Sequence, residues 1–166
     1  MGIRQEIADI LSRQRKVVRR AGVTLDLTPA SAGNGANLFN ILGGPVLVYA
    51  LFGECTVNIG GGAAVPRLQF LSAAATLSGL CVAATTIAAV VAGTLLTWTG
   101  LLAGLLTPAV GLAHLDLTGA EAGFNSPLTF GIGSVRLTNA VSAVSGIIDW
   151  YLAYEPCTPQ SLVTPG

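Results

Sequence analysis

The spacing of apolar and polar residues differs between the N-terminal part of this chain and the rest. In residues 1–20 the apolar positions recur at helical spacing, which predicts an amphipathic helix of about five turns ending at Gly22. From residue 38 onward, short β-prone runs alternate with glycine-rich separators, which predicts a mainly β, single sandwich or barrel-like body. The apolar residues at helical spacing are Ile3, Ile7, Ile10, Leu11, Val17 and Val18.

Turn signals at intervals of roughly ten residues divide the body into short strands. Gly43-Gly44-Pro45, Gly53 and the Gly60 to Gly62 triplet act as separators. Residues 72–77 are compatible with either a short Ala-rich helix or a loop. The expected strands are 39–42, 46–52, 56–59, 67–71, 80–84, 86–91, 94–99, 129–137 and 146–154.

The last of these strands has the most distinctive pattern. Ile148, Trp150, Leu152 and Tyr154 alternate with Asp149, Tyr151, Ala153 and Glu155, and Pro156 follows. A period of two places large apolar side chains on one face, so we expect a core strand that ends at the proline.

The same patterns divide the chain into four parts. Residues 1–27 form a basic amphipathic arm, residues 28–37 a Pro/Gly/Ser/Asn linker, residues 38–156 the β-rich body and residues 157–166 a C-terminal tail. At 166 residues the chain has the usual size of one domain and can bury a sizeable core.

Residues 68–115 contain no Lys, Arg, Asp or Glu, so lipid or protein must cover much of them. Residues 87–106 are long enough to cross a bilayer. However, threonines and glycines recur there at strand and turn spacing, and no basic anchors lie near either end. We therefore expect β-structure buried within and between subunits, with Leu96, Trp98, Trp150, Leu152 and Tyr154 as oligomer or core positions, and no membrane span.

Charge is sparse and unevenly distributed. Charged residues make up 10% of the chain, against about 25% on average, which favours an obligate oligomer over a free monomer. Residues 1–20 sum to +4 and the remainder to −4. The arm could bind nucleic acid, a membrane surface or an acidic protein, or simply be solvated. We expect it to dock on a protein partner through Arg4, Arg13, Arg15, Lys16, Arg19 and Arg20.

The residues that usually carry catalysis are scarce. His114 is the only histidine, and no serine lies in a nucleophile-elbow motif. Cys55, Cys81 and Cys157 are widely spaced and odd in number, so they predict neither a metal site nor a disulfide framework. The acidic residues show no paired spacing. We expect no enzymatic activity, no cofactor and no metal.

Four glycine-punctuated runs carry a resemblance: Phe39 to Tyr49 (FNILGGPVLVY), Thr56 to Gly60 (TVNIG), Gly93 to Gly100 (GTLLTWTG) and Trp150 to Pro156 (WYLAYEP). Together they resemble small virion structural proteins of tailed bacteriophages over roughly residues 37–156. Within that group the β-rich members of this size include capsid decoration, or cement, proteins. These sit on the outside of the major capsid lattice, commonly as trimers.

The resemblance implies a non-enzymatic subunit that binds the major capsid protein and itself, stabilises the DNA-filled head and is located on the virion surface after assembly in the host cytoplasm. No direct contact with nucleic acid or membrane is expected. Two alternatives remain. A tail or host-attachment subunit would use exposed aromatics such as Trp98 and Trp150 to bind sugars, and a holin-like protein would be extracted from membranes with detergent.

Overall fold

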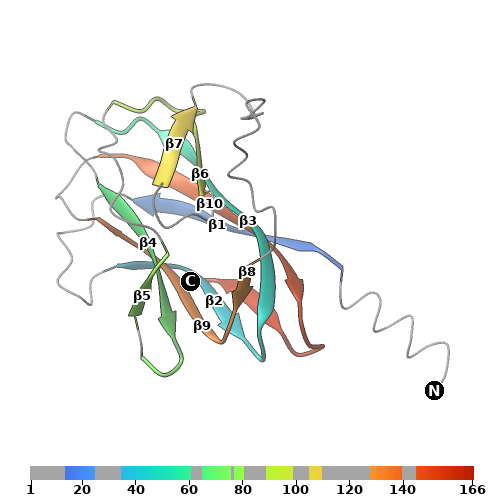
Figure 1. The fold of residues 1–166 in the computed structure, drawn as a ribbon. Helices are drawn as coiled ribbons and strands as arrows, with labels where there is room; N and C mark the ends of the chain where they lie inside the picture. The colour runs from blue at the N-terminus through green and yellow to red at the C-terminus, as the bar shows by residue number, and fades with distance from the viewer. Residues whose placement is uncertain are drawn as a thin grey trace, which may run out of the picture.

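The computed structural model describes residues 14–24, 35–60, 65–75, 77–80, 89–98, 105–109, 128–139 and 145–166 (Figure 1). Within these ranges the chain forms strands and turns and contains no helix. The strands are β1 (Lys16–Thr24), β2 (Ala36–Leu42), β3 (Val46–Val57), β4 (Pro66–Ser72), β5 (Leu77–Gly79), β6 (Leu95–Trp98), β7 (Leu105–Ala109), β8 (Leu128–Phe130), β9 (Gly133–Asn139), β10 (Ile147–Pro156) and β11 (Leu162–Pro165).

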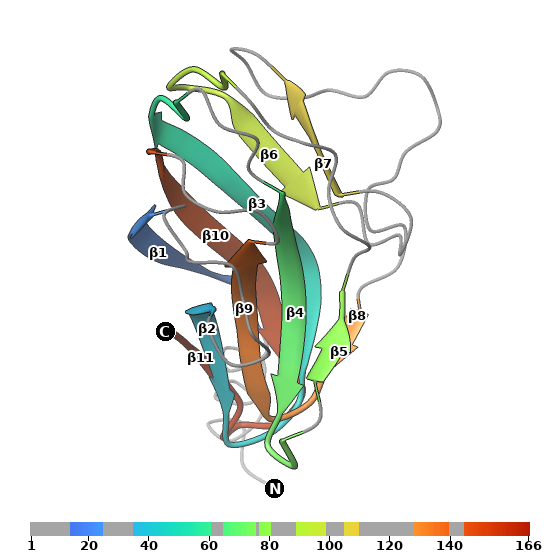
Figure 2. The same ribbon diagram turned by 90° about the vertical axis from the view of Figure 1, so that its left-hand side faces the viewer.

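The strands form two antiparallel sheets that face each other (Figure 2). Sheet A has the order β1-β10-β3-β6-β7, and β8 pairs with β3 beyond the end of β6. Sheet B has the order β11-β2-β9-β4-β5. Strands far apart in sequence are therefore neighbours, as in sandwich folds. The mainly β body predicted from the periodicity is confirmed.

The core lies between the two sheets. Trp150, Leu152 and Tyr154 of β10 are buried, as the period of two predicts, and they face buried residues of sheet B such as Phe39 and Leu137. The Tyr154 hydroxyl accepts a hydrogen bond from the Val163 N–H at 3.3 Å and thereby ties sheet A to β11. Phe70 of β4 also stacks on Phe130 of β8 across the layers, with ring centroids 5.3 Å apart.

The predicted N-terminal helix is wrong where the structure describes it, because residues 16–20 belong to β1. Val17 is 66% exposed while Val18 faces the core, which is a period of two, whereas a helix would place both on one apolar stripe. Pairing with β10 supplies the ladder that a local pattern cannot show. The rest of the predicted helix, residues 1–13, lies outside the described residues.

Gly53 does not separate two strands, as the sequence suggested, but lies inside the continuous strand β3. A Cβ atom there would lie 2.6 Å from Ile148 Cγ2 and 3.2 Å from Trp150 Cε3. The glycine therefore makes room for the Trp150 ring. By contrast, Gly43 is a true turn residue, since its φ of 71° is a conformation that other residues rarely adopt.

The boundaries of the body also differ from the predicted ones. The predicted linker ended at residue 37, but Ala36 already pairs with Leu137 of β9. The predicted C-terminal tail contains β11, which pairs with β2 at the edge of sheet B. In the range 72–77, ambiguous between helix and loop, Ser72 is the last residue of β4 and Leu77 the first of the antiparallel strand β5.

Part of the uncharged region 68–115 is visible as β4, β5, β6 and β7. Leu96 of β6 is fully buried. Among the described residues, no helix has the length and apolar character needed to cross a membrane. Residues 76, 81–88, 99–104 and 110–115 lie outside the described residues.

The outermost strands of both sheets carry features that oppose edge-to-edge pairing. β1 has a bulge between Arg20 and Val23, and Lys16 and Arg19 are exposed on it. β7 contains Pro108, while β5 is three residues long and β11 ends at Pro165. These features oppose the addition of a further strand to the described edges of either sheet.

Candidate interaction surface

The bulge of β1 is held by one carboxylate on the neighbouring strand. Asp149 of β10 is buried, and its Oδ1 accepts a hydrogen bond from the Gly22 N–H at 2.7 Å. Its Oδ2 accepts from Arg19 Nε at 3.1 Å and forms an ion pair with the same guanidinium. Gly22 has a φ of 70°, which suits a glycine at a bulge. We call this arrangement the Asp149 clip, and it fixes the edge strand to sheet A.

The clip changes the ionisation of both partners. The Arg19 guanidinium, and after it the Gly22 N–H, hold the pKa of Asp149 below its usual value. The same hydrogen bond raises the pKa of Arg19. Asp149 is therefore charged at neutral pH, and its contacts with Arg19 and Gly22 are formed under physiological conditions.

Beside the clip, the outer face of sheet A presents an aromatic pair. Arg19, Tyr151, Phe52 and Thr97 lie in one row across β1, β10, β3 and β6. The Phe52 and Tyr151 rings stack with centroids 5.0 Å apart and an interplanar angle of 12°. The Tyr151 hydroxyl also donates to Glu54 at 3.5 Å. Because neighbours hold these side chains, the face is preorganised for contact.

A second polar group lies at the other end of the same face. The Tyr49 hydroxyl donates to Glu155 Oε2 at 2.8 Å, and this hydrogen bond raises the pKa of Tyr49. The Arg15 guanidinium lies 4.0 Å from the centroid of the Tyr49 ring. This cation–π contact places a positive charge just before β1 begins.

Acidic groups gather on this side of the molecule. Within the described ranges the acidic residues are Glu54, Asp149 and Glu155. All three occupy positions of β3 or β10 that lie on the outer face of sheet A. Sheet B carries Arg67 and Arg136 instead. The outer face of sheet A therefore combines both signs of charge with aromatic rings, which is a composition typical of protein-binding surfaces.

The described members of the predicted basic cluster lie at the start of β1 and along it, but the strand places Arg19 on the opposite face from Lys16 and Arg20. Arg15 precedes β1, and Lys16, Arg19 and Arg20 lie within it. Lys16 and Arg19 are exposed, whereas Arg20 is half-buried, and its Nε has no hydrogen-bond partner within the described part of the chain. These residues form a fixed edge strand and not a separate arm. Arg4 and Arg13 lie outside the described residues.

The predicted oligomer or core residues lie elsewhere. Leu96, Trp150, Leu152 and Tyr154 are buried inside a single chain, between the sheets. Trp150 is therefore unavailable as an exposed sugar-binding aromatic, which removes one support for a host-attachment subunit. Trp98 of β6 pairs with Leu51 of β3, but the structure does not describe the Trp98 side chain.

Sequence reasoning missed the contacts made by Asp149, Tyr49 and Glu155. The alternation in β10 did place Asp149, Tyr151 and Glu155 on one face, and this was the available signal. Their partners on β1 and β3 are 97 to 130 residues away in sequence, so no local pattern contains them.

Reactive groups are few in the part of the chain that the structure describes. No group of three or more His, Cys, Asp or Glu residues is placed there to hold a metal ion. Cys55 and Cys157 are free thiols, and burial raises the pKa of Cys55, which makes it less reactive. His114 and Cys81 lie outside the described residues. No protein-family model, curated protein or solved structure matches the chain.

Proposed function

We propose that the protein is a non-enzymatic capsid decoration, or cement, subunit of a tailed bacteriophage. In this proposal it binds the major capsid protein on the outside of the lattice, associates with itself as a trimer and stabilises the DNA-filled head. Binding that occurs only on the assembled shell lowers the free energy of the shell relative to its dissociated parts.

The observation that supports this proposal best is the Asp149 clip. A decoration protein must present a fixed surface to a repeating lattice, and the clip fixes β1 beside the stacked Phe52 and Tyr151 rings. Preorganised side chains lose little conformational freedom on binding, so more of the contact energy is available as affinity. We therefore propose the outer face of sheet A, with its edge strand β1, as the docking surface.

The composition of purified particles tests the proposal directly. We expect the protein to be a stoichiometric component of virions, present in many copies, because decorating a lattice requires one binding event at every site. Quantitative mass spectrometry of purified particles measures the copy number. Absence from particles, or only a few copies in each, would refute the decoration function, and a few copies would point to the tail.

The docking surface gives a second prediction. Neutralising two exposed charges at the start of β1, with Arg15→Gln and Lys16→Gln, should weaken binding to undecorated capsids about fivefold at low salt. The difference should shrink at high salt because exposed charges are screened. Binding isotherms at two salt concentrations measure this effect.

Arg67→Gln is the matched control, since Arg67 is an exposed base on sheet B. It should bind as the unmodified protein does. The control removes one positive charge and the double variant two, so a control that loses half as much binding free energy would mean that only total charge matters. An unchanged affinity of the double variant at every salt concentration would exclude β1 from the docking surface.

A further inference from the structure

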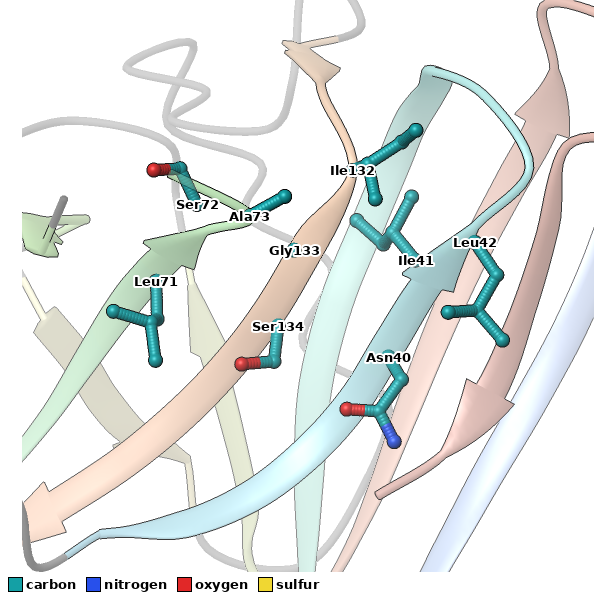
Figure 3. Close-up of a pocket in the computed structure, with 9 residues that line it drawn as sticks. All are labelled: Asn40, Ile41, Leu42, Leu71, Ser72, Ala73, Ile132, Gly133 and Ser134. Carbon is teal, nitrogen blue, oxygen red and sulfur yellow. The ribbon is translucent and has the colours of Figure 1, made fainter. Parts of the chain in front are cut away.

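An apolar groove crosses the outer face of sheet B near one end of the sandwich (Figure 3). It has a volume of about 290 Å³ and lies over β2, β9 and the end of β4. Asn40 and Ser134 form its polar part, while Leu42, Leu71 and Ile132 form its apolar part. The groove is open and shallow, so it suits a chain segment better than an enclosed small molecule.

Three large apolar side chains are exposed in this groove or beside it. Leu42 and Leu162 are cross-strand neighbours on β2 and β11, and they are 47% and 46% exposed. Ile132, in the turn before β9, is 46% exposed. Such a cluster on an otherwise polar face indicates a surface that another segment covers.

The groove lies on the side of the molecule where β1 begins. β1 and β11 are the outermost strands of sheets A and B, and they contact each other at the same side of the sandwich. Lys16, at the start of β1, pairs with Tyr154. The Tyr154 hydroxyl reaches the Val163 N–H, next to Leu162. The start of β1 thus lies across the spacing between the two sheets, about 10 Å, from β11, and β11 pairs with β2 at the edge of the groove.

We infer that residues 1–13 of the same chain dock in this groove and cover Leu42, Leu162 and Ile132. Ile3, Ile7, Ile10 and Leu11 of this segment recur at the spacing of one helical face. As a helix, thirteen residues extend about 20 Å, which is enough to pass β11 and reach the outer face of sheet B. The apolar stripe and the exposed patch would then cover each other.

The inference goes beyond the decoration function and does not depend on it, because it concerns the isolated protein in solution. Docking would place Arg4 and Arg13 beside a sheet face that already carries Arg67 and Arg136. The result would be a strongly basic surface opposite the mixed-charge outer face of sheet A.

Paramagnetic relaxation measured by NMR tests the docking. A nitroxide on Cys157 serves as the probe, since this thiol is exposed and its N–H bonds to Pro45 in the turn after β2. Cys81→Ser restricts labelling to this position, because Cys55 is buried. With isoleucine methyl groups isotope-labelled, we expect the Ile3, Ile7 and Ile10 signals to lose most of their intensity.

Paired variants identify the groove as the cause. Leu42→Ser with Leu162→Ser should restore the three signals, whereas Val57→Ser should not. Val57 is a suitable control because it is 46% exposed but lies at the opposite end of β3 from the turn at Pro45. Restoration by both variants, or by neither, would overturn the inference.

Two further outcomes would also overturn it, and neither requires a variant of the groove to fold. Undiminished isoleucine signals in the labelled protein would show that the segment does not dock. Signal loss that persists when the spin label and the isotope label are on different molecules would show that the segment docks on a neighbouring copy. Copy number in virions has no bearing on either result.

Discussion

Replacing Leu96 by Asp is expected to leave no folded protein at neutral pH. Leu96 is fully buried in β6, and it pairs with Gly53, over which the Trp150 ring lies. An unpaired carboxylate in this apolar layer costs more than the roughly 5–15 kcal/mol by which small domains are stable, unless it is protonated. Circular dichroism of the purified variant should lose its β-sheet signal, and expression should yield insoluble protein.

Leu96→Met is the control for this substitution. It keeps the volume and the apolar character, so it should cost less than about 1.5 kcal/mol and leave the spectrum unchanged. A folded Leu96→Asp variant, with a urea midpoint near that of Leu96→Met, would mean that β6 is not packed in the core as described.

Removing the Asp149 carboxylate is expected to have the second largest effect. Asp149→Ala should reduce the free energy of unfolding by about 2 kcal/mol, because the Gly22 N–H loses its hydrogen bond to a charged, buried carboxylate. The ion pair adds less, since the Arg19 side chain is 58% exposed and screened by water. Asp149→Asn keeps one acceptor and should cost less than Asp149→Ala. Urea denaturation of the three proteins at neutral pH measures this order.

The pH dependence of the unfolding free energy distinguishes the effect of the Asp149 charge from the effect of its side-chain shape. The folded-state pKa of Asp149 is lowered, so its charge stabilises the fold above the unfolded-state value of about 3.9. This stability is lost as pH falls through the lower folded-state pKa. The unmodified protein should therefore be more stable than Asp149→Asn at pH 7, and the difference should disappear in strong acid. A constant difference at all pH values would exclude a role for the charge.

The predictable parts of the fold were those in which neighbouring residues carry the signal. The alternation of Ile148, Trp150, Leu152 and Tyr154 correctly placed a buried strand, because a period of two is visible in sequence. Gly53 was misread as a turn, since the reason for the glycine is the Trp150 ring on the neighbouring strand. Val17 and Val18 fitted a helical stripe equally well as a strand, and only the pairing with β10 decides between them.

The candidate surface was predictable in its charges but not in its geometry. The sequence indicated that Arg15, Lys16, Arg19 and Arg20 form a basic cluster, and the alternation of β1 places Arg19 on the opposite face from Lys16 and Arg20. It gave no sign that Asp149 would hold Arg19, because the two residues are 130 positions apart. Long-range pairing of this kind depends on the whole sheet, which local propensity cannot describe.

The pairing of β1 with β10 also has a consequence for the time at which the protein can fold. Arg19 and Asp149 are separated by 130 residues, and ribosomes add about 5–20 residues per second, so β1 waits roughly 7–26 s for its partner. During this interval the nascent strand has no ladder and could pair with other chains. Lys16, Arg19 and Arg20 then oppose aggregation of the growing polypeptide, before any of them has formed its native contacts.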